Sequence, residues 1–243
     1  VDTAGRVDPD IVSHRVRVTP GRLDWNTLYE SLEGVYAFGD YETVDFLIEG
    51  PRDRRVLTIE PRIAAEAPTR LRAGLVFGTE FSSESMFGLR VGIDRTRLNR
   101  LRADWKTRVE VGRRTALSTE LYQPLDASQR LFVSPFVGWD RYPRNIFLGD
   151  SVVARYFDTR IQARFDTGLS FGSLGELRLG LVRDRNTFSQ EIGSPSWIDA
   201  TAERAGGELR ARFDQLDNVR IPRSGWMAEA VVGVYGDFLG ADT

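Results

Sequence analysis

Side chains suited to catalysis are scarce in this chain of 243 residues. It has one histidine, His14, and no cysteine, so thiolate and imidazole metal sites are not expected. The segment DIVSHRVRV is typical of an exposed helix end rather than of a Ser-His-Asp triad. The nucleophile pattern G-x-S-x-G and the phosphate-binding glycine motifs are missing, and in SFGSLGEL the first glycine position holds Phe171. We therefore expect no catalysis, metal or cofactor in this chain.

The residue types that stand out are charges at alternate positions. In LRADWKTRVEVG, residues 101–112, the even positions are almost all charged and the odd positions are uncharged. Because successive side chains of a strand point to opposite faces, this spacing predicts strands with one ionic face. Such a face could line a water-filled conduit or simply solvate the inside of a barrel wall. The predicted lumen-lining residues are Arg102, Asp104, Lys106, Arg108, Glu110, Arg160, Arg164, Glu208, Arg210 and Arg212.

Whole-chain properties exclude several classes of protein. The formal net charge is -2, so nucleic acid is not an expected partner. The mean hydropathy is -0.31, and no apolar stretch approaches the length of about 20 residues that a transmembrane helix needs. The start has no basic-then-apolar leader, so we expect a signal sequence to have been removed or to lie upstream.

Residues 1–66 are predicted to be a mixed α/β unit. In GRLDWNTLYESLEGVY, apolar residues recur at steps of three and four, which indicates an amphipathic helix. Asp24 is suited to cap its start, and Gly39 to end it. YETVDFLI and RRVLTIEPRI then alternate as strands, joined by the turn EGPRDR. The predicted order is helix, strand, turn, strand.

Residues 70–243 change to a period of two, after a linker in RIAAEAPTRL. We predict about nine antiparallel strands in a meander. The connectors RTRLN, DASQ, FGSLG and DNVRIPRSG are fairly short, and SSES, RYPRNIFLGDS and SQEIGSPSWIDAT, which alternate with them, tend to be longer. Only the turn around GRR, between the third and fourth strands, breaks this rule. Short turns at one end and long loops at the other are typical of an outer-membrane barrel.

Two folds fit this alternation. A soluble lipocalin-like barrel would bury the apolar face around a ligand, whereas a membrane barrel would turn it towards lipid. Residues 101–112, 154–171 and 225–238 are long enough to cross a bilayer, and Ala, Gly and Thr dilute their apolar face, both of which favour the membrane barrel. Trp226 and Phe238 would lie roughly 28 Å apart along the membrane normal, near the height of an apolar band flanked by aromatic girdles. The predicted lipid-facing aromatics are Trp105, Phe157, Phe165, Trp226 and Phe238.

Particular segments also resemble a known family. LDWNTLYESLEGVYAFGDYETVDFLIEG is similar to the second half of a polypeptide-transport-associated (POTRA) domain, with Tyr41 and Val44 at matching positions. LRADWKTRVEVGRRTALSTELYQPLDASQRLFVSPFVGWDRY resembles the barrel start of patatin-like type Vd autotransporters, which belong to the bacterial surface antigen superfamily. LDNVRIPRSGW matches that superfamily's turn at Asp217, Pro222 and Gly225, which our strand count puts at the periplasmic end.

The resemblance implies a periplasmic POTRA domain and an outer-membrane barrel that secretes or displays an N-terminal patatin-like lipase. Its implied partners are outer-membrane lipid, a passenger polypeptide and the barrel-assembly machinery. The family barrel has about sixteen strands, and the lipase domain, the first POTRA strand and an Arg-Gly-Phe lumen-loop motif have no counterpart here. We therefore expect an internal part of a longer protein. The alternative enzyme hypothesis is that this segment only anchors a phospholipase whose catalytic domain lies upstream.

Overall fold

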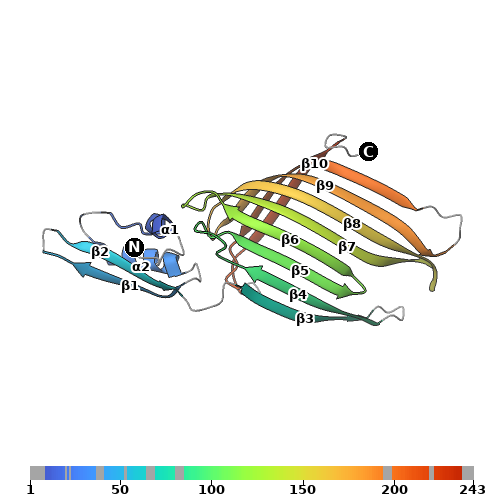
Figure 1. Cartoon of the computed structure of the whole chain (residues 1–243), viewed down its shortest axis with the longest axis horizontal. Helices are drawn as coiled ribbons and strands as arrows, with labels where there is room; N and C mark the ends of the chain where they lie inside the picture. The colour runs from blue at the N-terminus through green and yellow to red at the C-terminus, as the bar shows by residue number, and fades with distance from the viewer. Residues whose placement is uncertain are drawn as a thin grey trace.

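The chain forms a small α/β unit followed by one large antiparallel sheet (Figure 1). The computed structural model describes residues 9–19, 21, 23–36, 41–51, 54–63, 69–79, 85–193, 199–218 and 222–236. The change from the small sheet to the large one falls between Ile63 and Thr69. The predicted mainly β class with meandering antiparallel strands is confirmed. Gly39 and Phe238 lie outside the described residues.

The small unit packs two helices on a two-stranded hairpin. Its elements are α1 (Pro9–Arg15), α2 (Trp25–Tyr36), β1 (Tyr41–Glu49) and β2 (Val56–Ile63). Asp24 caps α2 as predicted, because its carboxylate accepts from the backbone N–H groups of Asn26 at 3.2 Å and Thr27 at 3.4 Å. The apolar stripe of α2 buries Leu28 and Leu32 against Ile59 of β2. A helix stripe and one hairpin face therefore make this core.

The large sheet has nine strands in sequence order, as predicted. Each strand pairs with its neighbours in the chain, so the topology is an up-and-down meander with β3 and β11 at its edges. The sheet curls, and β10 lies behind the front strands in Figure 1. The strands are β3 (Thr69–Thr79), β4 (Ser85–Arg95), β5 (Asp104–Gly112), β6 (Thr115–Pro124), β7 (Leu131–Leu148), β8 (Ser151–Ser170), β9 (Gly175–Ile192), β10 (Ala200–Asp214) and β11 (Met227–Tyr235).

The predicted difference in loop length between the two ends of the sheet is wrong. We define the near end as the end where β3 begins; there residues 96–103, 125–130, 171–174 and 215–226 connect the strands. At the opposite, far end, residues 113–114 and 149–150 are two-residue turns. The segment RYPRNIFLGDS continues β7 and β8, whose backbones stay paired up to Leu148 and Ser151. Backbone pairing can run beyond the apolar alternation because polar side chains tolerate water on both faces.

The two faces of the large sheet have opposite character. On the apolar face Trp105, Ile161 and Val232 are 47%, 50% and 66% exposed. On the ionic face Asp166 is 0% and Asp184 2% exposed, although no second layer of described elements covers that face. Side chains of a curled sheet crowd one another on its concave side and spread apart on its convex side. The ionic face is therefore the inner, concave face, and the apolar face is the outer one.

Candidate functional site

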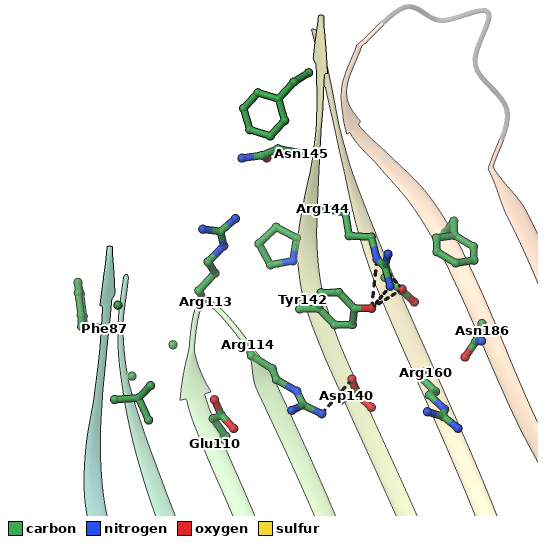
Figure 2. Close-up of a pocket in the computed structure, with 18 residues that line it drawn as sticks. Phe87, Glu110, Arg113, Arg114, Asp140, Tyr142, Arg144, Asn145, Arg160 and Asn186 are labelled. Carbon is green, nitrogen blue, oxygen red and sulfur yellow. Dashed lines mark hydrogen bonds and ion pairs between the residues drawn. The ribbon is translucent and has the colours of Figure 1, made fainter. Parts of the chain in front are cut away.

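A cavity of about 950 Å³, lined by charged and by apolar side chains, opens on the inner face towards the far end (Figure 2). Arg114 pairs with Asp140 across the β6–β7 ladder at 3.3 Å. The Asp158 carboxylate accepts from the Tyr142 hydroxyl at 2.7 Å and from Arg144 Nε at 3.0 Å. Guanidinium groups and carboxylates thus line this space, which suits water and ions better than an apolar ligand.

The ionic wall continues along β3, β4 and β5. Asp94 is buried between Arg72, at 3.0 Å, and Arg108, at 2.5 Å, which come from the strands on either side. Arg90 pairs with Glu110 at 2.9 Å. In these pairs the carboxylates lie against the sheet and the guanidinium groups extend over them, because arginine has the longer side chain.

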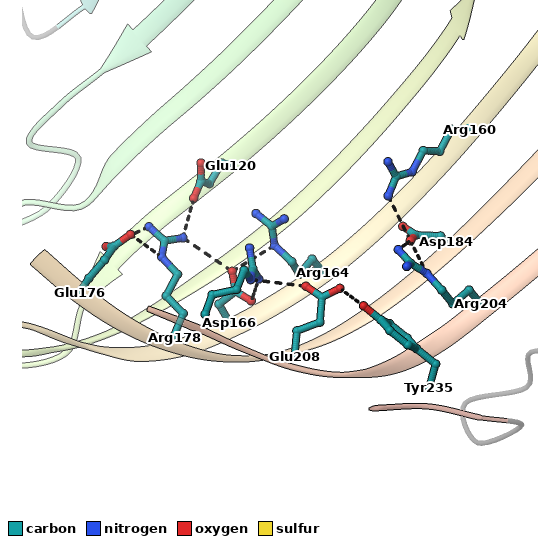
Figure 3. Close-up of polar contacts among 11 residues, drawn as sticks. Glu120, Arg160, Arg164, Asp166, Glu176, Arg178, Asp184, Arg204, Glu208 and Tyr235 are labelled. Carbon is teal, nitrogen blue, oxygen red and sulfur yellow. Dashed lines mark hydrogen bonds and ion pairs between the residues drawn. The ribbon is translucent and has the colours of Figure 1, made fainter. Parts of the chain in front are cut away.

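The most deeply buried ionic group is Asp166 on β8 (Figure 3). Its carboxylate lies 2.6 Å from Arg210 Nη2, 3.1 Å from Arg164 Nε and 3.6 Å from Arg178 Nη1. Each of these three arginine side chains is only 16–18% exposed. An aspartate shared by arginines from β8, β9 and β10 therefore ties three strands together, and we call these four residues the Asp166 cluster.

Glutamates complete the charge balance around the Asp166 cluster. Glu176 and Glu120 accept from Arg178 at 2.8 Å and 3.2 Å. Glu208 lies 3.4 Å from Arg210 and accepts from the Tyr235 hydroxyl at 2.7 Å. The network therefore extends from β6 to β11 on the inner face.

A second inner cluster centres on Asp184 of β9. Arg160 lies 3.1 Å from its carboxylate, and Arg204 also pairs with it. The Arg204 guanidinium lies 4.4 Å from the centroid of the Tyr235 ring, a cation–π contact that joins β10 to β11.

Most of the predicted lumen-lining residues lie on the inner face. Arg108, Glu110, Arg160, Arg164, Glu208 and Arg210 take part in the ion pairs above. Asp104, Lys106 and Arg212 lie on the same face by register, opposite Tyr122, Glu120 and Glu176. The prediction missed Asp94, Asp166, Asp184 and Arg178, although the same alternation placed them on the ionic face.

The prediction is wrong for Arg102, which belongs to the connection between β4 and β5. Its φ of 65° is in the left-handed region, which an extended strand cannot contain. The Asn99 side chain holds this turn by accepting from the backbone N–H groups of Leu101 and Ala103. Arg102 instead lies near α1, where burial lowers the pKa of Arg15 and the charge of Arg102 adds to that effect.

The predicted lipid-facing aromatics that the structure describes are on the outer face. Trp105 and Phe165 are about half exposed on the convex surface. Trp226 packs beside Phe213 with ring centroids 6.3 Å apart, and Phe213 packs at the same distance from Phe171. Phe157 differs, because the Arg141 guanidinium lies 3.8 Å above its ring centroid. Rings thus border the outer face at the near end, and arginine appears at the far end.

The predicted turn motif is held by Asp217. Its Oδ1 accepts from the backbone N–H groups of Arg223 at 2.9 Å and Ser224 at 3.2 Å. Gly225 has a φ of 104°, and a Cβ there would collide with the backbone of Gln215. Pro222 lies exposed between these positions. Asp217 and Gly225 therefore fix the path of the β10–β11 connection at the near end.

Replacing Asp217 by alanine should destabilise this turn in a pH-dependent way. Hydrogen bonds from Arg223 and Ser224 lower the pKa of Asp217, so its contribution is present above the ordinary pKa of about 4 and is lost as pH falls through the folded-state value. Urea unfolding of the full-length protein should show a wild-type advantage at neutral pH that shrinks in acid. Asp150→Ala, an exposed change in the β7–β8 turn at the opposite end of the sheet, is the matched control. An Asp217→Ala difference that is constant with pH would contradict this.

Gly168 on β8 makes room for an aromatic side chain on the inner face. The Phe132 ring lies over it, stacked on Tyr122 with centroids 4.6 Å apart and with Arg178 5.2 Å above. A Cβ at Gly168 would lie 2.5 Å from the Leu177 carbonyl oxygen and 2.6 Å from Phe132 Cζ. The sheet therefore needs glycine at this position.

Gly168→Ala should lower the free energy of unfolding by about 1–3 kcal/mol, the usual cost of overpacking. Gly207→Ala is the matched control, because a Cβ there would meet nothing closer than the Gly180 carbonyl oxygen at 4.0 Å. Urea unfolding of both full-length variants measures the difference. Equal stability of the two variants would show that the Phe132 contact imposes no constraint.

No helix among the described residues is both long and apolar enough to span a membrane. The same residues contain no group of three or more His, Cys, Asp or Glu side chains that could hold a metal ion.

Comparison with solved structures supports the architecture. A crystal structure of BamA from Haemophilus ducreyi lacking POTRA domains 1–3 is similar, with a TM-score of 0.71 and 12% sequence identity. The match covers 98% of this chain and 47% of that one, so this chain spans less than half of that length. The sequence matches no protein-family model and no curated protein. At this identity the likeness shows the fold alone.

Proposed function

We propose that the chain forms the first part of an outer-membrane β-barrel, with a periplasmic module at its N-terminus, that translocates or displays a polypeptide. The observation that carries the proposal is the orientation of the two faces. Half-exposed apolar residues form the convex surface, and buried ion pairs form the concave one. In a barrel wall this order presents hydrocarbon-like side chains to lipid and charge to a wet interior.

The soluble lipocalin-like alternative requires the opposite orientation. Its apolar face would enclose a ligand, yet Leu75 and Phe77 are 69% and 75% exposed on the outer face of β3. Soluble monomers rarely expose apolar patches larger than a few hundred Å². The described strands therefore favour lipid, rather than water, as the solvent of the convex face.

The small unit is proposed to be POTRA-like and periplasmic. Its connection to β3 leads to the near end of the sheet, which also carries the Asp217 turn. Along β2 a cavity of about 860 Å³ is lined by apolar residues that include Val16, Val18 and Leu57. Among the described residues, the partner of β2 in the sheet is β1, and the other edge of β2 could accept an extended peptide by strand addition.

The finer part of the proposal concerns the passenger. From the resemblance alone, it would be an N-terminal patatin-like lipase, and this chain would catalyse no reaction itself. The second candidate makes this segment merely the anchor of a phospholipase. A G-x-S-x-G motif in the upstream sequence, with lipase activity that survives removal of this segment, would favour the anchor.

Reconstitution of the full-length protein tests the main proposal. We expect it to need detergent for extraction, to conduct ions in planar bilayers, and to leave its passenger domain, rather than the periplasmic module, accessible to protease on intact cells. A protein that stays monodisperse in water without detergent would overturn the barrel. Stable insertion without conductance or surface exposure would overturn the transport role.

A further inference from the structure

Towards the far end, the outer face changes from apolar to charged side chains on β7, β9 and β10, whereas β8, which lies between β7 and β9, carries Thr159 and Phe157 there (Figure 1). On β9 the outward positions run Leu177, Leu179, Leu181 and then Arg183 and Arg185. On β7 they run from Leu131 to Trp139 and then to Arg141. On β8 Ile161 is followed by Thr159, and on β10 Ala205 is followed by Glu203. This step marks the far boundary of the apolar band.

The charge at that boundary is mainly positive. The side chains of Arg183 and Arg185 are 50% and 58% exposed and lie on either side of Glu203, at 3.0 Å and 3.6 Å from its carboxylate. Arg141, exposed on the same face, stacks on the Phe157 ring. We call Arg141, Arg183, Arg185 and Glu203 the outer arginine strip. Its sum of three positive charges and one negative charge is +2.

The opposite edge of the band has a different chemistry. At the near end, Phe171, Phe213 and Trp226 form a row of aromatic rings on the outer face. Aromatic rings, above all those of Trp and Tyr, are enriched at both membrane–water interfaces and carry no preference for headgroup charge. Guanidinium groups bind phosphate oxygens through two parallel N–H donors, and a positive strip at the edge of an apolar band is attracted to anionic headgroups.

We propose that the outer arginine strip binds the phosphate groups of anionic lipid headgroups in the leaflet at the far end of the barrel. The inference rests on the proposed membrane orientation and deepens it by naming a lipid partner. The apolar band below the strip would contact the acyl chains of the same lipid. Glu203 weakens the site, since its carboxylate competes with phosphate for Arg183 and Arg185.

Native mass spectrometry of the full-length protein in detergent with diphosphorylated lipid A tests this. Lipid retention should fall about five-fold for each arginine removed in Arg183→Gln and Arg185→Gln, as expected for about 1 kcal/mol per surface cation. Glu203→Gln should raise retention. The double variant Lys106→Gln/Arg212→Gln removes two positive charges from the inner face, as many as Arg183→Gln and Arg185→Gln remove together from the outer face. It should retain lipid as the wild type does.

Two comparisons separate the possible failures. Lipid A stripped of its phosphates should be retained weakly and equally by all variants; tight retention of the stripped lipid would show that acyl chains alone are bound and would overturn the site. Equal loss in the inner-face double variant would overturn it as well. If the wild-type protein inserts and conducts but retains no lipid A, this inference alone is wrong. If it never inserts, the proposed function is wrong as well.

Discussion

Asp166→Asn should destabilise the folded protein by about 3–5 kcal/mol, the usual cost of removing one partner from a buried ionic group. Asp166 is fully buried and is shared by Arg164, Arg178 and Arg210. Its neutralisation leaves their guanidinium groups crowded together on the inner wall. Urea unfolding of the full-length protein in vesicles measures the loss.

Glu110→Gln provides the comparison for Asp166. Its partner Arg90 is 59% exposed, so water screens that pair and the variant should unfold close to the wild type. If Asp166→Asn proved equally mild, the inner wall would be well hydrated at β8, and the Asp166 cluster would not hold the strands together.

Phe165→Arg should disturb folding almost as strongly, but only in a bilayer. Phe165 lies midway between Leu169 and Ile161, in the apolar part of the outer face of β8. An arginine at the midplane of a membrane barrel costs about 2–4 kcal/mol. Folding yield and unfolding free energy in vesicles measure that cost. In water the same change would replace an exposed ring by a charge and should be nearly neutral.

Gln162→Arg is the matched control, since it adds the same side chain to the same strand. Gln162 points to the inner face, opposite Asp184, where a new guanidinium finds a carboxylate. We expect this variant to fold as the wild type does. A penalty for Gln162→Arg that equals the one for Phe165→Arg would contradict the assignment of the two faces, and a larger one would reverse it.

Alternation along the chain was enough to predict the strands and to separate the faces of most of them. It did not assign the faces of β6 and β7, because Phe132 and Phe136 share the inner face of β7 with Asp140. On β8, for example, Ile161 lies on the outer face and Asp166, an odd number of positions later, lies on the inner face. Successive side chains of a strand point to opposite faces, so this follows from the spacing alone. Asp24 was also predictable as a cap, since capping depends on residues only two and three positions away. These features depend on residues that are close in the sequence, so a single sequence is enough to predict them.

The partners across strands were not predictable in the same way. Asp166 and Arg210 are 44 positions apart and meet only because β8, β9 and β10 pair side by side in one register. Arg102 fits the alternation of the sequence. It is not part of a strand, however, because the turn held by Asn99 extends to Ala103 and β5 starts at Asp104. The polar ends of β7 and β8 gave no apolar signal, although their backbones remain paired.

The strands differ in length, so the far end of the large sheet is not level. β8 has 20 residues, so with a rise of about 3.3 Å per residue and a tilt near 45° it stands roughly 47 Å high, well above a hydrocarbon core of about 30 Å. β5 has 9 residues and by the same arithmetic reaches only about 21 Å. In the proposed membrane orientation, the β7–β9 side therefore extends beyond the bilayer, whereas β5 ends near the edge of the apolar band of about 25 Å. A molecule that approaches the far end of the sheet would therefore meet a taller wall along β7–β9 than along β5.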